Sequence, residues 1–66
     1  MKNKLKVQRA IHDLTQGALA EKIGVTRQSI NAIEKGKYVP STVLALKIAK
    51  LFNESVENIF ELEDKD

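Results

Sequence analysis

Residues 24 to 36, GVTRQSINAIEKG, combine apolar and long polar side chains at helical spacing. On a helix, Ile30 and Ile33 would point inward. The outward face would then carry guanidinium, carboxamide and ammonium groups, from Arg27, Gln28, Asn31 and Lys35. In the major groove, a guanidinium can pair with guanine O6 and N7, and a carboxamide can pair with adenine N6 and N7. We interpret this face as one suited to reading DNA.

Such a face needs a helix with defined ends. Gly24 and Gly36 bracket the segment, and glycine is expected where a helix ends in a left-handed residue. Thr26 is placed to cap the start of the helix, which should run to about Lys35. The same reasoning predicts five short helices, at about residues 3–12, 16–23, 27–35, 42–52 and 56–60. The N-caps of the last four would be Thr15, Thr26, Ser41 and Ser55.

The segment 42–52 is apolar on nearly every side except at Lys47 and Lys50. This pattern predicts the central, buried helix. No stretch alternates with period two for long enough to demand a sheet, although two or three residues at either end of the chain could pair as strands. We therefore expect an all-α fold that forms a single domain over residues 1–66.

The charge of the chain is divided unevenly. Residues 1–53 carry ten lysines and arginines against three acids, a net +7, and residues 54–66 carry one lysine against six acids, a net −5. A basic body suggests a polyanionic partner. There is no cysteine, no apolar run of the ~18 residues that a membrane span needs, and no signal peptide. We expect a cytoplasmic protein without membrane contact and without a small-molecule sensor domain.

Catalysis finds little support in the sequence. His12 and Asp13 are the one His-Asp pair, but successive residues on a helix do not face each other. His12 is better explained as a residue that the helix dipole favours near a C-terminus. Asp64 and Asp66 are too few ligands for a metal site. We expect no catalytic residue, metal or cofactor.

The block Thr15 to Gly36, TQGALAEKIGVTRQSINAIEKG, has the layout of a helix-turn-helix. A capped helix is followed by a short turn and a second capped helix. Small Ala20 would let the helices approach closely, Gly24 would free the backbone at the turn, and Val25 would fill the crossing. In such a motif the second helix enters the major groove by its N-terminal end.

The sequence also resembles the phage repressor and Cro-type helix-turn-helix regulators (XRE family), in particular their minimal stand-alone members. The resemblance covers nearly the whole chain, from LKVQR through the core TQGALAEKIGVTRQSINAIEKGK and YVPS to ALKIAKLF and SVENIF. It implies a compact five-helix lambda-repressor-like domain with its helix-turn-helix core at 15–36.

The resemblance also implies roles for individual residues. The residues implied to contact bases are Arg27, Gln28 and Asn31, the last of which would reach a base or a phosphate. The residues implied to contact the DNA backbone are Gln16, Thr26, Lys35, Lys37 and Tyr38. An ion pair between Arg9 and Glu34 would clip the first helix to the third. Gly17 departs from the family pattern and should cost up to ~1 kcal/mol relative to alanine.

These residues together suggest a sequence-specific transcriptional regulator, a repressor, that binds a palindromic double-stranded operator as a homodimer. The dimerisation segment would be residues 55–66, through Val56, Ile59, Phe60 and Leu62. Of these, Ile59 is the one expected to complete the monomer core. The competing interpretation is a protein-interaction adaptor or an antitoxin built on the same fold.

Overall fold

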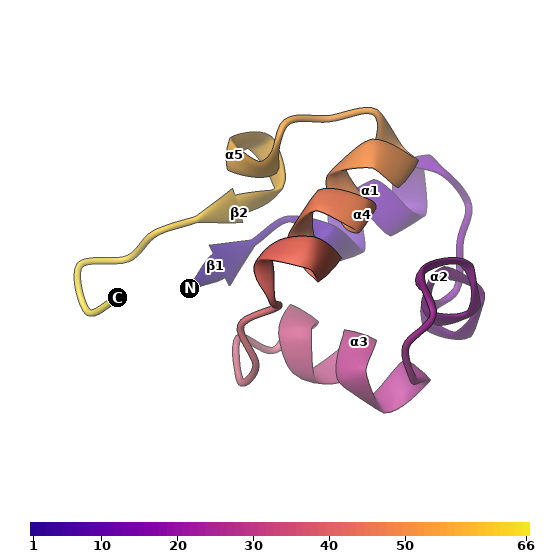
Figure 1. Cartoon of the computed structure of the whole chain (residues 1–66), viewed down its shortest axis with the longest axis horizontal. Coiled ribbons are helices and arrows are strands. Elements are labelled where there is room, and N and C mark those ends of the chain that lie inside the picture. The colour runs from indigo at the N-terminus through magenta and orange to yellow at the C-terminus, as the bar shows by residue number, and fades with distance from the viewer.

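The computed structural model describes residues 1–66 as five helices and one pair of short strands (Figure 1). The elements are β1 (Lys2–Asn3), α1 (Leu5–Ile11), α2 (Gln16–Ile23), α3 (Arg27–Glu34), α4 (Thr42–Phe52), α5 (Val56–Ile59) and β2 (Phe60–Glu61). The all-α prediction, with a short strand pair at the chain ends, is confirmed. None of the helices has the length and apolar character that crossing a bilayer would require.

Four helices begin at the N-caps predicted from the sequence. The side-chain oxygens of Thr15, Thr26, Ser41 and Ser55 each accept a hydrogen bond from the backbone N–H three residues ahead, at 3.0–3.2 Å. Each cap satisfies one of the N–H groups that the first turn of a helix leaves without a partner. At the other end of α2, Gly24 takes the left-handed conformation with φ 77°, as predicted.

The first helix is shorter than predicted, because Asn3 belongs to β1. The side chain of Asn3 accepts a hydrogen bond from the Leu5 N–H at 3.1 Å and donates one to the Ile33 carbonyl at 2.8 Å. Asn3 therefore ties the start of the chain to α3 instead of continuing α1.

The two ends of the chain meet in an antiparallel pair, in which Lys2 faces Glu61 and Asn3 faces Phe60. The Lys4 N–H extends the pairing with a 2.7 Å hydrogen bond to the Ile59 carbonyl. Figure 1 shows β1 and β2 side by side, with α3 along a different edge of the molecule.

One apolar core joins all five helices and β2. Its twelve buried residues are Leu5, Leu19, Ala20, Ile23, Ile30, Ile33, Leu44, Ile48, Ala49, Phe52, Ile59 and Phe60. The prediction that segment 42–52 is the central, buried helix holds for one face of α4, where Leu44, Ile48, Ala49 and Phe52 are buried. On the other face, Val43 is 65% exposed and Leu46 is 56% exposed. A chain of this size has too few elements to cover both sides of a helix.

Candidate nucleic-acid interface

The helix-turn-helix core is held by apolar contacts between α2 and α3. Leu19 and Ala20 are buried on α2, and Ile30 and Ile33 are buried on α3. Val25, in the turn between the helices, packs against the same core. This packing fixes α3 by its apolar side and leaves its polar side outward.

The start of α3 presents the side chains that the sequence suggested for reading bases. Arg27 and Gln28 are both exposed in the first turn. Gly17 of α2 lies beside Arg27, because a Cβ atom at Gly17 would be 3.9 Å from the Arg27 Cδ. The Thr26 hydroxyl accepts from the Ser29 N–H and lies 3.0 Å from the Ser29 hydroxyl, so the cap closes the first turn next to these residues.

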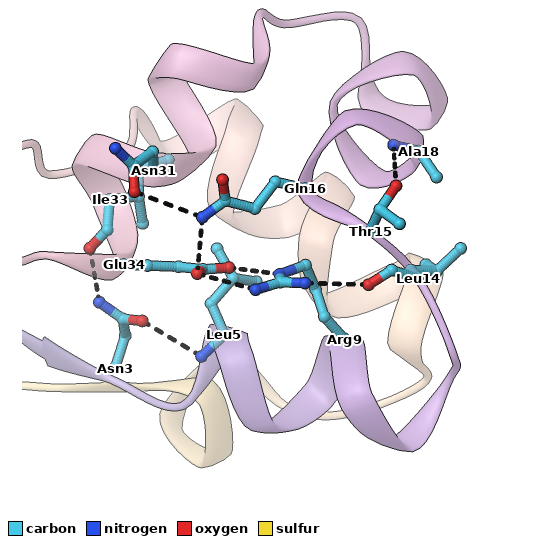
Figure 2. A network of polar contacts seen from close by, with 10 residues as sticks. All are labelled: Asn3, Leu5, Arg9, Leu14, Thr15, Gln16, Ala18, Asn31, Ile33 and Glu34. Atoms are coloured by element: carbon cyan, nitrogen blue, oxygen red, sulfur yellow. Dashed lines mark hydrogen bonds and ion pairs between the residues drawn. The ribbon is translucent and has the colours of Figure 1, made fainter.

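Behind that face, Arg9 of α1 and Glu34 of α3 form an ion pair, as the resemblance implied (Figure 2). Arg9 donates to both carboxylate oxygens, from Nε at 2.5 Å and from Nη2 at 3.0 Å. Its Nη1 donates to the Leu14 carbonyl at 3.0 Å. Because five N–H donors form a rigid fork, an arginine held in this way joins two helices in one orientation.

The ion pair shifts the protonation of both groups. Burial alone would raise the pKa of Glu34, but hydrogen bonds from Arg9 and Gln16, with the positive charges of Arg9 and Lys6, hold that pKa below its ordinary value. The hydrogen bond to Glu34 raises the pKa of Arg9. Glu34 therefore stays ionised and accepts hydrogen bonds without donating any.

The side chain of Gln16, for which the resemblance implied a phosphate contact, makes hydrogen bonds within the protein. Its Nε2 amino group lies 3.1 Å from Glu34 Oε1 and 3.4 Å from Asn31 Oδ1, both acceptors (Figure 2). The two N–H bonds of that group are thereby engaged inside the protein.

Asn31 connects this interior network to the polar face of α3. Its side chain is half-buried, and its Oδ1 faces Gln16. Its Nδ2 makes no hydrogen bond within the protein and points away from Gln16 in Figure 2. The sequence did not reveal this connection, because Gln16 and Asn31 become neighbours only when α2 packs on α3.

The residues predicted to contact the DNA backbone after α3 lie together on the surface. Lys35, Lys37 and Tyr38 are all exposed, and Gly36 turns the chain between the lysines with φ 73°. The structure therefore separates a first-turn group, Arg27 and Gln28, from a cationic loop that follows the helix.

The comparisons with known proteins agree with this geometry. The family model described as helix-turn-helix matches residues 5–59. The chain belongs to the helix-turn-helix family. The resemblance to this family seen in the sequence is confirmed, and the family indicates a DNA-binding regulator instead of an enzyme.

Three relatives of this helix-turn-helix chain are described as uncharacterized HTH-type transcriptional regulators. One from Methanocaldococcus jannaschii is 62% identical over the whole of both chains. YgzD from Bacillus subtilis is 53% identical, again over the whole of both chains. One from Archaeoglobus fulgidus is 44% identical over all of this chain and 94% of its own length.

The predicted dimer residues of this helix-turn-helix chain need correction. Ile59 and Phe60 are only 1% and 7% exposed, so their side chains belong to the core and leave little surface for a partner. For Ile59 the sequence had allowed this, but Phe60 had been assigned to the partner. Its backbone leaves the helix for an extended conformation with φ −116° and ψ 138°, which turns the ring inward. Val56 is half-buried and Leu62 is 77% exposed.

His12 has a structural role in the helix-turn-helix domain. Its ring packs against that of Phe52 with centroids 4.9 Å apart and planes at 41°. Such tilted stacking is a common aromatic arrangement. His12 therefore covers one end of the core.

Proposed function

We propose that this chain is a transcriptional repressor that recognises a specific double-stranded DNA sequence with α3 in the major groove. The observation that carries the proposal is the exposure of Arg27 and Gln28 in the first turn of a helix whose other side is fixed by Ile30 and Ile33. In a helix-turn-helix, the N-terminal residues of the second helix are the ones that contact base edges.

Each part of the surface has its own task in this proposal. Arg27 pairs with a guanine and Gln28 with a neighbouring base. Lys35, Lys37 and Tyr38 contact the sugar-phosphate backbone beside the groove, where contacts set the position of the protein without reading sequence. Thr26 caps the first turn of α3. Since that end of α3 enters the groove in this proposal, Thr26 would also contact a phosphate. Repression then needs only that the protein occupies its operator.

We further propose that the regulator binds a palindromic operator as a homodimer in the cytoplasm. One helix reads few base pairs, whereas two helices held about 34 Å apart read two half-sites on one face of the duplex. Leu46 and Val56 line one open groove between α4 and α5, and Val43 lies one helical turn before Leu46. We assign these apolar residues to the contact with the partner subunit, in place of Ile59 and Phe60. Leu62, which is exposed after β2 and lies outside this groove, stays a second candidate for that contact.

Selection from a pool of duplexes with a randomised centre tests the function. We expect the wild-type chain to enrich a palindrome, with log K falling linearly as log salt rises. A protein-interaction adaptor would bind no duplex even at low salt. The cationic loop alone would produce salt-dependent binding without an enriched sequence, which would contradict base reading by α3.

A further inference from the structure

Four side chains from three helices form one continuous polar chain beneath the proposed DNA-reading face. In order, they are Arg9 of α1, Glu34 of α3, Gln16 of α2 and Asn31 of α3 (Figure 2). The first link joins charged groups that are mostly buried, since the Arg9 and Glu34 side chains are 15% and 8% exposed. The last member, Asn31, reaches the polar side of α3.

The chemistry of each link sets the orientation of the next. An ionised carboxylate can only accept, so Glu34 Oε1 requires the amino end of the Gln16 amide, which it meets at 3.1 Å. That same amino end then faces Asn31 at 3.4 Å. Only the side-chain oxygen of Asn31 can accept a hydrogen bond from this amino group, because the opposite orientation of the Asn31 amide would bring two amino groups together. The orientation of Asn31 is thereby determined by the charge on Glu34.

We propose that Gln16 is a specificity-determining positioning residue, through which the Arg9–Glu34 pair makes Asn31 offer only hydrogen-bond donors to a base. This inference rests on the proposed docking of α3 in the major groove. An asparagine that is free to rotate can pair with adenine, by donating to N7 and accepting from N6. Here the Asn31 oxygen is already turned toward Gln16.

A donor-only Asn31 discriminates among the four bases. Guanine presents two acceptors in the major groove, O6 and N7, and thymine presents one, O4. Cytosine presents a donor there, and adenine presents one acceptor beside a donor. At its operator position, Asn31 should therefore favour guanine or thymine, disfavour cytosine, and lack the usual preference of asparagine for adenine.

The test compares base preferences of four proteins on the same pool of randomised duplexes: wild type, Asn31→Ala, Gln16→Met and Gln8→Met. Asn31→Ala locates the position that Asn31 reads. Gln16→Met removes the link to Asn31 while keeping a side chain of similar length. The preference for adenine over guanine and thymine at that position should then rise about five-fold or more, which is the low end of the discrimination that a bidentate pair provides. Gln8→Met is the matched control, since Gln8 is a half-buried glutamine of α1 outside the network, and it should keep the wild-type preference.

A purely structural role for Gln16 would weaken all duplexes together. The expected result is instead a change of base preference at one position, on top of any equal change in affinity for all duplexes. The inference is overturned if Gln16→Met keeps the wild-type preference, if the wild type already selects adenine there, or if Asn31→Ala weakens every duplex equally. Failure of the wild type to select any sequence would overturn the proposed function as well. A wild type that selects a sequence and loses preference at one position in Arg27→Ala, while Gln16→Met leaves preference unchanged, would overturn this inference alone.

A measurement on the wild-type protein without DNA tests the same coupling even if Gln16→Met does not fold. As the pH falls through the pKa of Glu34, the side-chain amide NMR signals of Gln16 and Asn31 should shift with a common midpoint. The side-chain amide of Asn53, the residue that ends α4 outside this network, should not follow that midpoint. Independent or absent shifts of Gln16 and Asn31 would overturn the coupling.

Discussion

Arg9 on α1 holds Glu34 on α3 through two hydrogen bonds, one to each carboxylate oxygen. The two residues stand 25 positions apart in the chain, so their contact measures how α1 is placed against the end of α3. Since both side chains are largely withdrawn from water, each charge depends on the other for its solvation. The stability of the domain and the position of the proposed DNA-reading helix, α3, therefore both depend on this ion pair.

Breaking the pair from one side should destabilise the domain strongly. We expect Arg9→Met to lower the free energy of unfolding by about 3 kcal/mol, because it strands the Glu34 charge. The double variant Arg9→Met/Glu34→Leu should recover part of the loss, since it removes both charges. Urea unfolding of the two single variants and the double variant measures the coupling; strictly additive effects would show that the pair contributes nothing.

The pair should also make stability depend on acidity. The folded pKa of Glu34 lies below its ordinary value of 4.5, so the carboxylate stabilises the fold at and above that pH. This stabilisation is lost as the pH falls below about 4.5 and passes through the folded pKa. Urea unfolding at a series of acidic pH values should show a steeper loss for the wild type than for Glu34→Gln. Parallel curves for the two proteins would contradict the assignment to Glu34.

Two glycines in the helix-turn-helix should respond in opposite ways to alanine. A Cβ at Gly17 would lie 3.9 Å from its nearest neighbour, so Gly17→Ala should stabilise the domain by about 0.5–1 kcal/mol through reduced chain entropy. Gly24 has open space around it but a φ of 77°, where alanine costs about 1–2 kcal/mol. Thermal unfolding should show the midpoint rising for Gly17→Ala and falling for Gly24→Ala. Changes in the same direction would refute the backbone explanation.

Substitutions should separate the contribution of base contacts from the contribution of contacts to the DNA backbone. Arg27→Ala should relax preference at one operator position, because a bidentate base contact discriminates by about 1–3 kcal/mol. Lys37→Ala should weaken all duplexes alike and lower the slope of log K against log salt by about one unit per subunit. Titrations on operator and scrambled duplexes at several salt concentrations compare the two. The proposed docking of α3 fails if Arg27→Ala weakens both duplexes equally while Lys37→Ala alters base preference.

The proposed partner surface can be tested on α4. A charge at Leu46 would have to be buried between subunits, so Leu46→Glu should convert a dimer to a monomer and reduce affinity for a palindromic operator. Ile11→Glu is the matched control, because Ile11 is an exposed apolar residue of α1 outside the groove. Sedimentation equilibrium of wild type and both variants reports the subunit state. A wild type that stays monomeric, free and on DNA, would rule out the homodimer.

The sequence by itself determined the helix order and the ends of most helices. Caps act over three residues and the left-handed residue at Gly24 over one turn, so these features depend on local chemistry that a linear chain already contains. The inward residues of α2 and α3 were equally predictable, because helical periodicity selects one face. The exposure of Arg27 and Gln28 follows from the same periodicity.

Only the tertiary structure decided which polar groups meet and which apolar residues are covered. Gln16 gives its amino group to Glu34 and Asn31 because α1, α2 and α3 converge there, and no local pattern encodes that convergence. Phe60 enters the core because the pairing of β2 with β1 ends α5 before it. Leu46 stays exposed because neither the strands nor the other four helices pack over that side of α4. Each of these outcomes depends on contacts between residues distant in sequence, and such contacts exist only after the helices have packed.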